Sequence, residues 1–192
     1  MQSGSELGQG NSGVGVTAPP RRLSGPLTGL VGSAFVSGAF FGFFEFLQRS
    51  PVRHEHVAGT AAWWEHLALA LATLVILCVA WWRHRGRFGP RSGRRWILAP
   101  LGTHAERRVA RAFGIGGGAP QLGRLLLALP AAAVFLFCFW RAGVQVTGGL
   151  DPNFTVNAWG GPTYLGALVC HYLDLFLLAC GAVRLLDRIL PD

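Results

Sequence analysis

Charged and imidazole side chains inside apolar stretches are the residues of this sequence with the greatest chemical potential. His171 and Asp174 are three residues apart in an apolar block, so a helix places them on one side. An ionised carboxylate at mid-membrane costs at least ~2.5 kcal/mol, so Asp174 needs a polar partner. Glu45, one turn beyond Gly42, is a third intramembrane candidate. These residues favour a proton relay, an ion site or a substrate anchor; the alternative is a neutral carboxyl group that joins two helices.

A second set of polar residues falls at the predicted outer surface. Glu65 and His66 begin the second apolar block, and Asp151 lies in the loop between the third and fourth blocks. Such side chains can act as acid and base. They and the His-Glu-His segment at 54–56 are also ligand types for zinc, but their spacing matches no established metal motif. We therefore expect no metal site and no cofactor.

The composition predicts that membrane-spanning helices position these residues. The chain is 51% hydrophobic and 14% charged, whereas soluble domains are about 25% charged. Its apolar residues form four blocks, each close to the ~20 residues that cross a bilayer: about 27–47, 61–82, 124–141 and 162–186. The sequence thus predicts an all-α integral membrane protein, a four-transmembrane-helix bundle over 27–192. A Gly-, Ser- and Gln-rich segment at 1–26 predicts a disordered cytoplasmic tail before it.

Small residues within the blocks predict close helix packing. Ala34, Gly38 and Gly42 repeat at four-residue spacing in the first block, and Gly166 lies on the predicted Asp174 side of the fourth. Such rows let two helix backbones approach each other. The pattern serves contacts within one chain and between chains equally well, so a membrane protein partner and a homo-oligomer both stay open.

The arginines predict the orientation in the membrane. Basic residues number 17 against nine acids, and every basic residue is an arginine. Fourteen arginines fall on one side of the four blocks and three on the other. The positive-inside rule then places both termini and the long middle loop in the cytoplasm. A lysine-free chain rich in Ala, Gly and Arg suggests a bacterial genome, and hence the bacterial plasma membrane.

The middle loop at 83–123 is strongly basic. A capping-box spacing at Thr103 and Glu106 predicts a short helix, and a Gly-rich hinge follows at 114–118. Such a segment can bind anionic lipid at the inner leaflet, or it can be a solvated loop that sets topology. Because the arginines flank apolar spans rather than cover a folded surface, we expect no nucleic-acid partner.

Three functions of different classes fit these observations. The first, which needs the fewest assumptions, is a non-enzymatic accessory or scaffold component of a membrane assembly. The second is a small proton- or ion-coupled transporter that uses Asp174 and His171. The third is a membrane enzyme that acts at the outer face through residues such as Glu65 and His66.

Overall fold

The computed structural model describes residues 23–88, 107 and 119–190. Residues 1–22 and most of the basic loop lie outside the described residues. Four expectations therefore also fall outside the described residues: the disordered tail, the capping box at Thr103 and Glu106, the hinge at 114–118 and the lipid-binding loop.

Four long helices make up nearly all of the described chain. They are α1 (Gly25–Leu47), α2 (Trp63–Phe88), α4 (Ala119–Gly148) and α6 (Tyr164–Ile189), and a short helix, α5 (Pro152–Thr155), precedes α6. Each long helix is long and apolar enough to cross a membrane, and the described residues contain no strand. The predicted all-α, four-helix membrane fold is confirmed. The third span continues to Gly148 instead of ending near 141.

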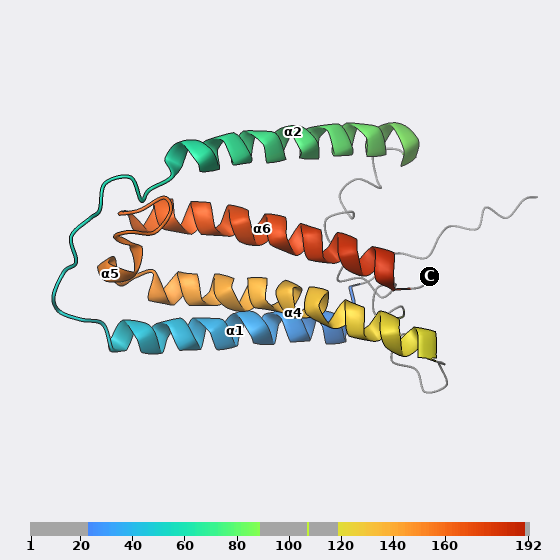
Figure 1. Cartoon of the computed structure of the whole chain (residues 1–192), viewed down its shortest axis with the longest axis horizontal. Helices are drawn as coiled ribbons and strands as arrows, with labels where there is room; N and C mark the ends of the chain where they lie inside the picture. The colour runs from blue at the N-terminus through green and yellow to red at the C-terminus, as the bar shows by residue number, and fades with distance from the viewer. Residues whose placement is uncertain (1–22, 89–106, 108–118, 191–192) are drawn as a thin grey trace, which may run out of the picture.

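The helices lie side by side in an open row, in the order α2, α6, α4, α1 (Figure 1). The contacts between helices follow the same order: α1 with α4 most extensively, then α4 with α6, and α2 sparsely with α6. Helices α1 and α2 are consecutive in sequence, yet they lie at opposite edges of the row. The short helix α5 and the segments 48–62 and 149–163 gather at one end, which we name the α5 end.

Glycines bring α1 and α4 into backbone contact. A Cβ added at Gly38 would collide with the Trp140 carbonyl, and one at Gly42 would collide with the Val144 carbonyl. Gly143 of α4 faces the Phe35 carbonyl in the reciprocal way. Close approach through small residues is how membrane helices gain packing energy without a hydrophobic driving force. Gly143 and Gly148, which lie beyond the predicted end of the span at 141, thus also pack against α1.

Tyrosine hydroxyls join α4 to α6. Tyr164 donates to the Val146 carbonyl and Tyr172 donates to the Ala142 carbonyl, both at 3.0 Å. A buried phenol needs a polar partner, and helix carbonyls supply one here. These two bonds, two turns apart along α6, fix the register of α6 against α4.

Asparagine side chains hold the two segments of the α5 end together. Asn153 accepts from the His54 N–H at 2.8 Å and donates to the Val52 carbonyl at 2.8 Å. Asn157 accepts from the Val57 N–H at 2.8 Å. The segment 149–163 is therefore pinned to the loop between α1 and α2.

Candidate functional site

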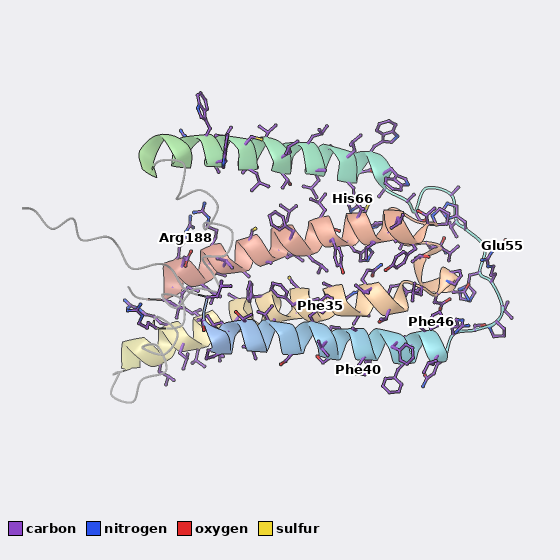
Figure 2. The ribbon with its side chains drawn as sticks, turned by 180° about the vertical axis from the view of Figure 1, so that it is seen from behind. Phe35, Phe40, Phe46, Glu55, His66 and Arg188 are labelled. Atoms are coloured by element: carbon purple, nitrogen blue, oxygen red, sulfur yellow. The ribbon has the colours of Figure 1, made fainter. Side chains whose placement is uncertain are left out.

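An imidazole and a carboxyl group join α2 to α6. His66 Nε2 lies 3.3 Å from Asp174 Oδ2, and His66 is buried. Figure 2 shows the His66 side chain between the two helices. The sequence analysis placed Asp174 beside His171 on one side of the fourth span and placed His66 at the outer surface. The structure instead brings Asp174 together with His66.

The other nitrogen of His66 fixes the protonation pattern of this pair. Nδ1 lies 2.8 Å from the Ala62 carbonyl, which can only accept, so Nδ1 carries a proton. Nε2 then faces the carboxyl group either as a lone pair opposite a protonated Asp174 or as an N–H opposite a carboxylate. The geometry therefore supports the transfer of one proton between the two side chains.

The loop before α6 packs around the start of α2 and sets this contact. The Gly160 N–H donates to the Ala61 carbonyl at 2.6 Å, and the Trp159 ring lies 5.5 Å from the His66 ring. Gly160 has φ +78°, and a Cβ there would collide with the Gly166 carbonyl. Glycine is the residue that adopts this backbone without strain. Gly166 in turn leaves space for the Trp63 ring. The first turn of α2, which carries His66, can therefore lie close to α6.

A second polar group lies on α4, which packs against the other side of α6. Gln145 is completely buried, and neither of its side-chain amide atoms has a hydrogen-bond partner among the described residues. Arg141, one turn earlier, is half-buried, and its Nη1 likewise lacks a partner there. His171 Nδ1 lies 3.1 Å from the Ala167 carbonyl. His171 is within electrostatic range of both Arg141 and Asp174.

The remaining sequence candidates lie apart from these groups. Glu45 is exposed on α1. Glu65 is exposed at the start of α2. Asp151 is the N-cap of α5, where its carboxylate accepts from the Asn153 N–H at 2.9 Å. The three do not form one outer-face site with His66.

Sequence reasoning missed the His66–Asp174 pair and the Arg141–Gln145 group for different reasons. The sequence placed His66 at the outer surface, because spacing alone could not show that Gly166 lets the first turn of α2 pack close to α6. Gln145 lay beyond the predicted end of the third span. One signal was available for Arg141: it is a charged residue close to an apolar block, without an acid one turn away.

No family model, no curated protein and no solved structure matches this chain. The site therefore rests on its geometry.

Proposed function

We propose that the chain is a non-enzymatic component of a bacterial plasma-membrane assembly and that the face of α1 opposite α4 binds a transmembrane helix of a partner. The partner is another membrane protein or a second copy of this chain. Both termini face the cytoplasm in this proposal, and the α5 end faces outward. The proposal makes no use of an active site.

The observation that carries this proposal is a second row of small residues on α1. Gly25, Gly29, Ser33 and Ser37 repeat at four-residue spacing and are all exposed. A Cβ at Gly29 would meet nothing within 4 Å. The first row, which contains Gly38 and Gly42, is occupied by α4 within the chain. A second row with the same spacing supports close approach of a further helix.

An apolar groove beside this row supports the same proposal. The groove lies between α1 and α4, with a volume of about 260 Å³, and it is lined by Phe35, Val36, Ala39, Phe40, Phe43 and Thr147. Phe40 is 62% exposed and points away from α4 (Figure 2). Large side chains beside a small-residue row form a knob-and-groove surface that a helix can match.

Affinity purification of the full-length chain in mild detergent tests this proposal. We expect a stoichiometric protein partner, or a dimer, with the natural sequence. Gly29→Leu and Ser33→Leu should remove it, because they fill the row. Gly181→Leu is the matched control, since Gly181 is also an exposed helical glycine with nothing within 4 Å. A monomer without a partner, or a partner retained in both row variants, would contradict the proposal.

The His66–Asp174 contact favours a second candidate function, a proton-coupled carrier. A carboxyl group and an imidazole 3.3 Å apart on two helices can exchange a proton. Intramembrane ionisable residues commonly mark such pathways. In this candidate, Asp174→Asn should abolish proton uptake into vesicles that contain the purified chain, while the chain still inserts and folds. Equal proton uptake by the variant and the natural sequence would exclude the carrier.

A further inference from the structure

Arg141 lies within the apolar span of α4 and has no ion pair among the described residues. Its guanidinium lies over the Phe154 ring of α5, 5.2 Å from the ring centroid. An aromatic face attracts a cation, but it does not neutralise the charge or accept the five N–H donors of the side chain. A buried charge normally has a partner of opposite sign. An anionic group from outside the described residues would supply one.

Gln145 is a second, independent sign of a missing partner. It lies one turn from Arg141 towards the α5 end, so both side chains project from a similar side of α4. Its exposed fraction is 0%, and both Nε2 and Oε1 lack partners among the described residues. Two buried polar groups one turn apart on α4, Arg141 Nη1 and the Gln145 amide, thus lack the partners that buried polar groups normally have.

The surface of α4 next to Arg141 is apolar and open. Three residues precede Arg141 at three- and four-residue spacing and so share its side of the helix: Pro130, Val134 and Phe137. All three are exposed; Phe137 is 50% exposed. The stripe runs away from the α5 end, which is the direction that acyl chains take from a headgroup.

We propose that Arg141 binds the phosphate oxyanion of a membrane phospholipid whose acyl chains lie along the stripe of Pro130, Val134 and Phe137. Arg141 lies about 10 Å from the end of α4 at 1.5 Å per residue. A long arginine side chain can cover much of that distance towards the headgroup level. A guanidinium also matches phosphate oxygens with two parallel hydrogen bonds.

Thermal unfolding of the full-length chain in a neutral detergent tests this proposal. Phosphatidylglycerol should raise Tm, since a ligand that binds the folded state stabilises it. Diacylglycerol with the same acyl chains should not, because it lacks the phosphate. In Arg141→Gln the half-saturating concentration of phosphatidylglycerol should rise at least tenfold, which is about 1.4 kcal/mol. Arg49→Gln is the matched control, since Arg49 also lies over a phenylalanine ring at the α5 end.

Three outcomes would overturn the proposal. They are an equal response of Arg141→Gln and Arg49→Gln, an equal effect of diacylglycerol, and a full effect of inorganic phosphate alone, which would identify a soluble anion as the ligand. Native mass spectrometry of the natural sequence supplies a test that needs no variant. It should retain phosphatidylglycerol in preference to diacylglycerol, and equal retention of the two would contradict the proposal.

Discussion

At the scale of single residues, the polar groups of this chain are placed by what surrounds them more than by their own spacing. Asp174 needs a polar partner in a membrane, and that requirement follows from the sequence alone. The identity of the partner does not follow from the sequence, because it depends on where α2 begins beside α6. The Gly160 N–H donates to the Ala61 carbonyl, and Gly166 leaves room for the Trp63 ring, so these contacts fix where α2 begins beside α6.

A double-mutant cycle measures the His66–Asp174 contact. We compare His66→Ala, Asp174→Ala and the double variant by their free energies of unfolding in detergent. Polar contacts between membrane helices couple by about 0.6 kcal/mol on average and up to about 1.7 kcal/mol, and we expect a value in that range. Thr73→Ala combined with Asp174→Ala is the control and should be additive, since the Thr73 hydroxyl donates to Leu69 within α2. Additivity in both cycles would contradict the contact.

At the scale of elements, α1 carries two rows of small residues that have different roles. The four-residue spacing of Gly38 and Gly42 predicts close packing, and the structure shows α4 as the element that packs there. The sequence could not decide between a contact within the chain and one between chains, because both need the same spacing. The exposed row that includes Gly29 becomes visible only after α4 has been assigned to the other face.

Alanine substitutions distinguish the two rows. Gly38→Ala forces a methyl group into the Trp140 backbone, so we expect a loss of about 1–3 kcal/mol in the free energy of unfolding, as for overpacked cores. Gly29→Ala meets open space and should be neutral or stabilise by up to about 1 kcal/mol through helix propensity. Unfolding of both variants in the same detergent checks this. Equal losses would mean that α1 packs differently.

The connection between the two loops at the α5 end can be tested by proteolysis. Asn153 bonds to both His54 and Val52, which flank Arg53. Asn153→Ala removes these bonds, each contributing about 1 kcal/mol. Trypsin should then cut after Arg53 severalfold faster, because the loop opens more often. Cleavage after Arg188, at the far end of α6, is the internal reference, and an unchanged ratio of the two cuts would count against the connection.

At the scale of the whole molecule, the number of helices followed from hydropathy, but their order did not. Hydropathy and length identify four spans because a bilayer sets both. They contain no information on neighbours, and the segment from 48 to 62 is long enough to let α1 and α2 separate. The glycines of α4 and the tyrosines of α6 determine that α4 packs between α1 and α6.

The distance between the edge helices tests the open row most directly. Spin labels at Val36 on α1 and Val75 on α2, both exposed near the middle of their helices, can be measured in lipid nanodiscs diluted with unlabelled chain. Three helix spacings of about 8–10 Å each predict a separation of roughly 25–30 Å. A distance of about 8–14 Å, as for adjacent or diagonal helices in a closed bundle with the same spacing, would contradict the row.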